Sequence, residues 1–198
     1  MRATGADAAD AATGLELELE AAGRPASDGI RLREAFETEL DGDAERGLPP
    51  GHFLVTWPDA RGKDAAAVYA RAVAGGSGDR KDEFLVYAGE EDPYTPAVAA
   101  NTADGEYLVV WQEGGEGDIY GRLTVTETTT GDAFTITGAE GTQQTPAVAW
   151  DAEEGVYLVV WAHANGSDDD VRGRVVAADG DPVGAEITIT ASAADEQY

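Results

Sequence analysis

The chain has 198 residues, of which 42% are hydrophobic, so it is long enough to form one large globular domain with its own core. Its 39 Asp and Glu residues against 13 Lys and Arg give a formal net charge of −26, and a surface this negative repels nucleic acid and anionic lipid. The absence of cysteine excludes disulfide bonds and thiolate metal sites.

The basic residues are unevenly chosen. Lys63 and Lys81 are the only lysines, and the other basic residues are arginines. A carboxylate-rich, lysine-poor surface stays hydrated when salt screens its self-repulsion. The composition therefore predicts adaptation to high salt, and the alternative is an acidic protein that needs no salt to fold.

The first fourteen residues are small and polar, and we expect them to be disordered. They contain no apolar stretch that could serve as a signal sequence, and no part of the chain has the roughly 20 apolar residues of a membrane span. We therefore expect the protein to be either intracellular or the mature or excised part of a longer precursor.

Residues 15–198 read as repeated β units. In the half unit 15–43, the alternating segments Leu15–Glu20 and Ile30–Arg33 predict the last two strands of a unit. Unit 1 (44–92) contains the strand-like segments Phe53–Trp57 and Val68–Arg71.

Units 2 (93–142) and 3 (143–198) share three segments at nearly constant spacing, and a fourth segment recurs at the ends of units 1 and 2. The three pairs are Thr95–Ala99 with Thr145–Ala149, Tyr107–Trp111 with Tyr157–Trp161, and Asp118–Arg122 with Asp170–Arg174. The fourth pair is Phe84–Tyr87 with Phe134–Thr137. Pro96 and Pro146 are expected at strand starts, where proline is tolerated. Four-stranded units of about 40–50 residues are typical of propeller blades. We therefore predict an all-β fold, a β-propeller or propeller fragment with about 3.5 repeats of roughly 50 residues.

The succession of PAVA, YLVVW, D-[IV]-[YR]-G-R and D-G-x-P-x-G segments resembles a repeat of exported microbial β-propellers, over about residues 44–198. More distantly, the layout is similar to sialidase-like propellers, although their S-x-D-x-G-x-T-W loops do not occur here. The resemblance implies an extracellular or cell-surface protein that binds through loops at one end of the ring.

Arg71, Arg122 and Arg174 occupy one position of the repeat. One interpretation is a set of guanidinium groups that clamp the carboxylates of an acidic ligand, which makes Arg122 and Arg174 candidate ligand-binding residues. The other is that each arginine pairs with an Asp or Glu of its own or the adjacent blade.

Two residues that interrupt the repeat are further candidates for ligand binding. Trp150 stands where the preceding unit has Ala100, and His163 is expected in a loop after Trp161. A residue that occurs once on a repeated fold is where a site would be grafted. The recurring Trp57, Trp111 and Trp161 are better explained as core residues than as a sugar-stacking surface.

Asp168, Asp169 and Asp170 offer the oxygen ligands that suit a structural calcium ion, although the twelve-residue calcium loop is absent. The alternative is a hydrated acidic surface. No other cofactor is expected.

No catalytic constellation is evident, so we expect a non-enzymatic binding or scaffold module of an exported, salt-adapted protein. The alternatives are a carbohydrate-active propeller enzyme, a glycosidase or sialidase-like one, and a structural repeat of a large surface protein. The expected partners are a protein or a carbohydrate and further propeller repeats of a longer parent chain, but neither nucleic acid nor an anionic membrane surface.

Overall fold

The computed structural model describes residues 51–61, 66–115, 117–165 and 168–190, and all regular structure within them is β-strand. The strands are β1 (His52–Asp59), β2 (Ala67–Ala74), β3 (Phe84–Tyr87), β4 (Pro93–Asn101), β5 (Glu106–Glu113), β6 (Asp118–Thr124), β7 (Thr129–Thr137), β8 (Thr142–Asp151), β9 (Val156–Asn165), β10 (Asp168–Ala177) and β11 (Pro182–Thr190). The all-β prediction is therefore confirmed. The half unit 15–43 lies outside the described residues.

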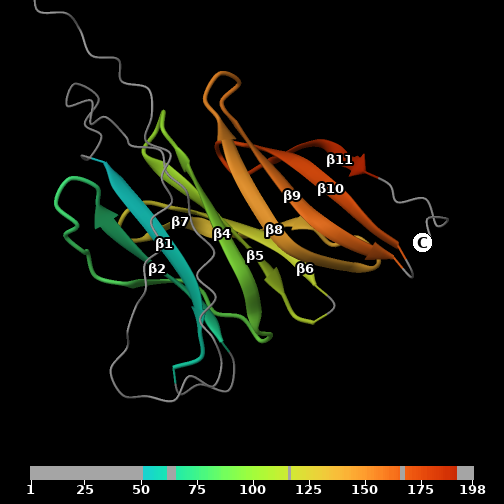
Figure 1. Ribbon diagram of the computed structural model, residues 1–198, viewed down its shortest axis with the longest axis horizontal. Helices are drawn as coiled ribbons and strands as arrows, with labels where there is room; N and C mark the ends of the chain where they lie inside the picture. Colours follow the sequence, from blue (N-terminus) through green and yellow to red (C-terminus); the bar gives the residue numbers. More distant parts are fainter. Residues whose placement is uncertain (1–50, 62–65, 116, 166–167, 191–198) are drawn as a thin grey trace, which may run out of the picture.

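These strands form three antiparallel sheets, each made of strands that follow one another in the chain. Sheet 1 contains β1, β2 and β3, sheet 2 contains β4 to β7, and sheet 3 contains β8 to β11. In Figure 1 the sheets succeed one another along the long axis, from cyan through green and yellow to red, with sheets 1 and 3 at opposite ends. The described part of the chain is thus an open row of sheets, and no ring closes within it.

Corresponding residues occupy corresponding places in the strand pairing. Each recurring arginine lies opposite the valine two positions before the recurring tryptophan (Trp57, Trp111 or Trp161) of its sheet. The pairs are Arg71–Val55, Arg122–Val109 and Arg174–Val159. Because side chains alternate between the two faces of a strand, an identical register places the arginines on the same face of each sheet.

The first strand of sheets 2 and 3 contains a β-bulge. The register shifts between Tyr94 and Ala97 in β4, and Thr95 within the bulge has a φ of 44°, while Thr145 of β8 has a φ of 49°. The expectation that Pro96 stands at a strand start is wrong, because β4 already begins at Pro93. Proline is accepted at this position because a bulge leaves a residue out of the hydrogen-bonded ladder.

The hairpin between β4 and β5 is closed by a polar turn. The Asn101 side-chain oxygen accepts hydrogen bonds from the backbone N–H groups of Ala103 (2.9 Å) and Asp104 (3.2 Å). Gly105 then takes the left-handed conformation, with a φ of 73°, that this turn requires.

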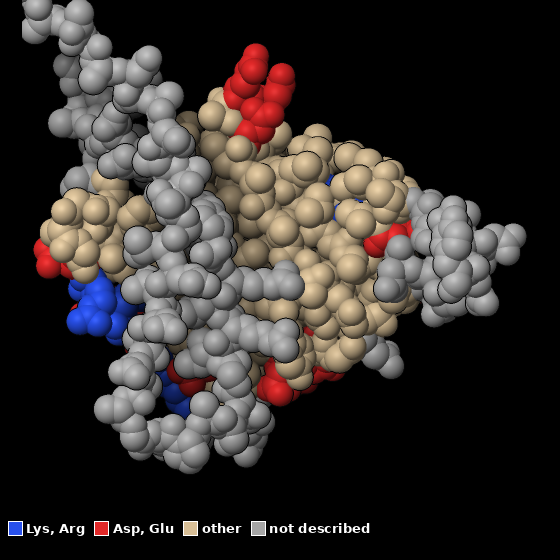
Figure 2. Space-filling view, viewed as in Figure 1, with Lys and Arg blue, Asp and Glu red and all other residues tan. Residues whose placement is uncertain are grey.

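The hydrophobic core lies between the sheets. One cluster, between sheets 1 and 2, includes Leu54, Val86 and Trp111, and a second, between sheets 2 and 3, includes Ile136 and Trp161. Charge is unevenly spread over the surface. In the view of Figure 2, Lys and Arg are gathered over sheet 1, Asp and Glu lie near the edges, and the middle of the face shown over the other two sheets has few charged side chains.

Candidate functional site

Two of the three recurring arginines connect neighbouring sheets, whereas Arg71 pairs with Glu83 of its own unit, at 3.3 Å, as the second interpretation of the sequence expects. Arg122 donates from Nη1 to the main-chain oxygen of Val86 in sheet 1, and Arg174 donates from Nη1 to the main-chain oxygen of Ile136 in sheet 2, each at 2.7 Å. Arg122 also donates from Nε and Nη2 to the oxygen of Gly131 in its own sheet, at 3.0 and 2.8 Å. These bonds go to main-chain carbonyls, an arrangement that neither interpretation of the sequence anticipates.

His163 lies within β9, so its predicted place in a loop is wrong. Its side chain is 1% exposed, and Nδ1 lies 3.3 Å from Nε2 of the fully buried Gln143. The strand simply continues past Trp161, because the ladder with β10 extends to Asp168 and Asn165. His163 is therefore a buried polar residue of sheet 3.

Trp150 is partly buried and packs against the core between sheets 2 and 3. Its ring lies 4.6 Å from that of Tyr157, the residue opposite it on β9. Its ring is therefore part of the packing between sheets 2 and 3.

The three aspartates of the predicted calcium site cannot be assembled from the described side chains. Those of Asp168 and Asp169 lie outside them, and Asp170 Oδ2 lies 3.8 Å from Nη2 of Arg172. Among the side chains that the structure does describe, no group of three metal-ligating residues occurs. Calcium binding at this position stays a prediction.

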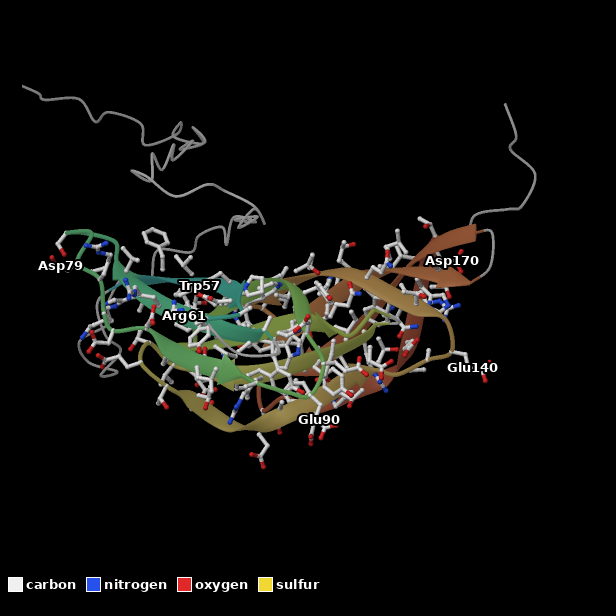
Figure 3. All side chains as sticks on the ribbon, turned by 90° about the horizontal axis from the view of Figure 1, so that it is seen from below. Trp57, Arg61, Asp79, Glu90, Glu140 and Asp170 are labelled. Atoms are coloured by element: carbon white, nitrogen blue, oxygen red, sulfur yellow. The ribbon has the colours of Figure 1, made fainter. Side chains whose placement is uncertain are left out.

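A cleft of about 340 Å³ opens beside the junction of sheets 1 and 2. It is lined by Tyr87 at the end of β3, the β3–β4 loop, the end of β5 and the start of β6, with the side chains Tyr87, Glu90, Glu91, Glu113, Asp118 and Tyr120. In Figure 3, Glu90 projects from the lower edge of the sheets into solvent. The cleft therefore combines four carboxyl groups with two phenol rings.

The back of the cleft is held by aromatic packing. The ring of Trp111, which is fully buried, lies 4.7 Å from Tyr87 and 6.3 Å from Tyr120. The Tyr87 hydroxyl donates a hydrogen bond to Glu113. Burial, this bond and the charge of Glu113 raise the pKa of Tyr87, so the phenol keeps its proton well above neutral pH.

Two glycines give the loops their close approach. A Cβ at Gly114, whose φ is 69°, would lie 1.8 Å from a carboxylate oxygen of Glu91, and one at Gly89 would collide with the Tyr87 hydroxyl. Gly114 also donates its N–H to the oxygen of Asp92 at 3.0 Å. The β3–β4 loop is thus fixed against the end of β5, which sets the width of the cleft.

The junction of sheets 2 and 3 has different residues at the same places. His163 corresponds to Glu113 in the strand register, because each pairs with the first aspartate of the matching D-x-x-G-R segment. Arg172 corresponds to Tyr120, because each pairs with the recurring tryptophan of its sheet. The guanidinium of Arg172 lies between Asp170, at 3.8 Å, and Glu186, at 4.0 Å. The second junction thus has a cation at the position that Tyr120 holds in the first, where no basic side chain is among the residues that line the cleft.

None of the six cleft residues was among the sites predicted from the sequence. The signal was nevertheless present, since the residue two places after the strand tryptophan differs between units, Glu113 in one and His163 in the next. That comparison singled out His163, which is buried, rather than its counterpart Glu113, which lines the cleft.

Comparison with known proteins adds no family or relative to this description. No family model, no curated protein and no solved structure matches the chain. No helix long and apolar enough to cross a membrane is found in the part of the chain that the structure describes.

Proposed function

We propose that this chain is a non-enzymatic binding or scaffold module built of β-propeller blades, and that it belongs to an exported protein adapted to high salt. Two observations support the architecture. Each sheet is a meander of consecutive antiparallel strands, and successive sheets pack face to face through recurring arginines. An open row of blades is what a fragment of a larger ring would leave.

The cleft between sheets 1 and 2 is the proposed binding site, and its ligand is an organic cation with an ammonium or guanidinium group, such as a basic side chain of a partner protein. The observation that carries this is the lining of four carboxyl groups and two phenols, without a basic residue. A hydrogen bond to a charged group contributes about 1.5–3 kcal/mol, and a cation over an aromatic ring about 0.5–2 kcal/mol.

Size and chemistry favour an organic cation over a bare metal ion. The cleft volume of about 340 Å³ lies in the range of small-molecule sites rather than that of a single ion. The rings of Tyr87 and Tyr120 add surfaces that suit an alkyl-bearing cation, whereas calcium and magnesium take only oxygen ligands.

High salt restricts how such a ligand can be held. At 1 M ionic strength the Debye length is about 3 Å, so the large negative charge of the protein attracts little beyond direct contact. The affinity must then come from groups that touch the ligand, and the partly buried pair Tyr87 and Glu113 provides two of them.

The test is a fluorescence titration of the full chain with arginine methyl ester and with tetramethylammonium, in dilute and in molar KCl. Trp111 reports binding because its ring contacts both cleft tyrosines. Glu113→Gln and Asp118→Asn are expected to weaken binding about tenfold each. Glu140→Gln serves as the matched control, because Glu140 is the counterpart of Glu90 at the second junction and does not line the cleft.

Saturable binding that the two cleft variants weaken and the control leaves intact would support the proposal. Binding that is absent, or that all three variants weaken alike, would refute the cleft as a cation site. The scaffold role would then be the remaining function for the module.

A further inference from the structure

The outer strands of the three sheets share a β-bulge at the same place. The register with the neighbouring strand skips one residue in each, which is Val86 in β3, Ile136 in β7 and Ile189 in β11. In β3 and β7 the main-chain oxygen of this residue accepts a hydrogen bond from a recurring arginine of the next sheet, at 2.7 Å. Because a bulge leaves a residue out of the hydrogen-bonded ladder, its carbonyl group can serve another sheet.

The outer strand of sheet 3 has this bulge, but no further sheet packs on it among the described residues. Ile189 is 48% exposed, whereas its counterpart Ile136 is 0% exposed. Ile187 is 45% exposed, whereas its counterpart Phe134 packs against the core between sheets 2 and 3. Sheet 3 therefore ends in the kind of apolar face and main-chain acceptor that the other two sheets bury at a junction.

Sheet 1, at the opposite end of the row (Figure 1), has the matching donor. Arg122 and Arg174 each use Nη2 for an oxygen of their own sheet and Nη1 for the preceding sheet. Arg71 uses Nη2 for Glu83 of its own unit, at 3.3 Å. Among the described residues, Nη1 of Arg71 donates to no main-chain oxygen, so the atom that crosses the junction in the other two arginines is available for an acceptor outside the described residues.

The apolar side chains beside Arg71 are also incompletely covered. Val55 and Trp57 are only partly buried. Their counterparts Val109 and Trp111, which sheet 1 covers, are both 0% exposed. The face of sheet 1 thus lacks the cover that a preceding sheet gives to sheet 2.

The turn after β2 has room for a side chain from outside. Gly78 and Gly180 occupy the same place, since each donates its N–H to the last alanine of the preceding strand. A Cβ at Gly180 would lie 2.8 Å from the ring of Phe134 in the preceding sheet, whereas a Cβ at Gly78 would have nothing within 4 Å. Ile187, the counterpart of Phe134, is the side chain of sheet 3 that fits this place.

We propose that sheet 3 of one copy packs on sheet 1 of a second copy in the way that consecutive sheets pack within the chain, and that the partner's Arg71 donates to the main-chain oxygen of Ile189. The two faces differ and complement each other in donor, acceptor and apolar side chains. The contact is therefore head to tail, and it continues the pattern of the two junctions already present in the chain.

Two copies arranged in this way use both faces of each chain. A head-to-tail contact closes into a ring when the rotation between copies allows it. Three described sheets from each copy give a pair about six blades, within the typical propeller range of about 4–8. The inference rests on the proposed blade architecture, but it does not depend on the cation site of the cleft.

The test is light scattering of the full chain in molar KCl over a range of protein concentrations, because salt screens the repulsion between two copies of net charge −26. We expect a pair whose dissociation constant rises about 100-fold in Ile189→Glu, about tenfold for each of its two contacts. Arg71→Ala should weaken the pair by a similar amount. Ile189 is exposed, so its variant should keep the parent's circular dichroism.

Thr188→Glu is the matched control. It adds the same charge to β11, but Thr188 is the counterpart of Thr135, which stays exposed at the junction of sheets 2 and 3. The control should therefore leave the dissociation constant of the pair unchanged.

A cross-link tests the direction of the contact. The rings of Tyr87 and Trp111 lie 4.7 Å apart across the first junction, and their counterparts are Thr190 and Trp57. Because the chain has no cysteine, Thr190→Cys and Trp57→Cys each carry a single thiol. We expect a short thiol cross-linker to give covalent dimers in a mixture of the two variants, but not in either alone.

A monomer at every protein concentration in molar KCl would overturn the inference, and so would equal weakening by Ile189→Glu and Thr188→Glu. Covalent dimers of Thr190→Cys alone would also overturn it, since they would place two like faces together. A mass above that of two chains would exclude the closed pair. Each of these outcomes leaves the cation site of the cleft standing, because that site is titrated separately.

Discussion

The guanidinium of Arg122 and the carbonyl group of Val86, 36 residues earlier in the chain, join sheet 2 to sheet 1. The relationship recurs between Arg174 and Ile136, 38 residues earlier. Because the acceptor is main chain, its side chain is free to vary, as Val86 and Ile136 do. The donor has no such freedom, since one side chain must reach two carbonyl groups in different sheets.

Replacing Arg122 should therefore destabilise the protein. We expect Arg122→Ala to lower the free energy of unfolding by roughly 1.5–3 kcal/mol, because the oxygen of Val86 loses a charged donor. Arg122→Lys should recover only part of this, since a single ammonium cannot serve Val86 and Gly131 with the geometry of the planar guanidinium. Urea unfolding at constant salt measures both, and a loss as large in Arg80→Ala would contradict the role assigned to Arg122.

Replacing the bulge residue Thr95 should stabilise the protein. A β-branched residue at a φ of 44° is strained, and such strain costs of order 1–3 kcal/mol, whereas asparagine tolerates this region. Thr95→Asn is expected to raise the urea midpoint by an amount equivalent to about 1 kcal/mol. A lower midpoint would mean that the threonine side chain makes contacts worth more than the strain.

Alkaline pH should destabilise the fold through Tyr107. Burial raises the pKa of Tyr107 to about 12 from an ordinary 10.0, and its hydroxyl donates to the oxygen of His52 at 2.7 Å. The unfolded chain therefore loses the phenol proton first. The stabilisation is complete below pH 10 and is lost between pH 10 and about 12, in total roughly 2–3 kcal/mol.

The measurement for this prediction is the free energy of unfolding from pH 9 to 12. Tyr107→Phe should make the decline shallower without abolishing it, because burial also raises the pKa of Tyr87 and of Tyr157. Tyr94→Phe, at a position that is 45% exposed, should leave it unchanged. A decline of equal slope in all three proteins would show that Tyr107 does not drive it.

The outer strands of sheets 2 and 3 offer a matched pair of isoleucines. Ile136 is 0% exposed between two sheets, whereas Ile189 at the same register position of β11 is 48% exposed. Ile136→Ala should cost about 2–5 kcal/mol of stability, and Ile189→Ala much less. Light scattering should show less self-association for Ile189→Ala, because the exposed apolar face of sheet 3 shrinks; equal costs for the two variants would mean that Ile189 is covered in solution.

Salt should control folding if the composition is an adaptation to it. With a formal net charge of −26, we expect a compact, β-rich species in molar KCl and a less stable one in dilute buffer. Circular dichroism with light scattering across a KCl series measures this. A monomer that is equally stable in dilute buffer would contradict the adaptation to salt and support the alternative, an acidic protein that needs no salt to fold.

Much of the local structure follows from the sequence. Alternation of apolar and polar residues, together with turns such as Asn101–Gly105, is enough to place strands, because both are properties of neighbouring residues. The repetition at about fifty residues also assigns Arg71, Arg122 and Arg174 to one position of the repeat, and the strand register agrees.

The partners of these residues depended on the tertiary structure. The sequence shows that Arg122 recurs, but only the packing of sheet 2 on sheet 1 places the carbonyl group of Val86 opposite it. In the same way, Glu113 at the end of β5 lines a cleft, while the equivalent His163 is buried at the next junction. A repeated sequence specifies each sheet through contacts between residues that are close in the chain. The chemistry of a junction depends instead on which side chains and main-chain groups of the neighbouring sheet lie opposite.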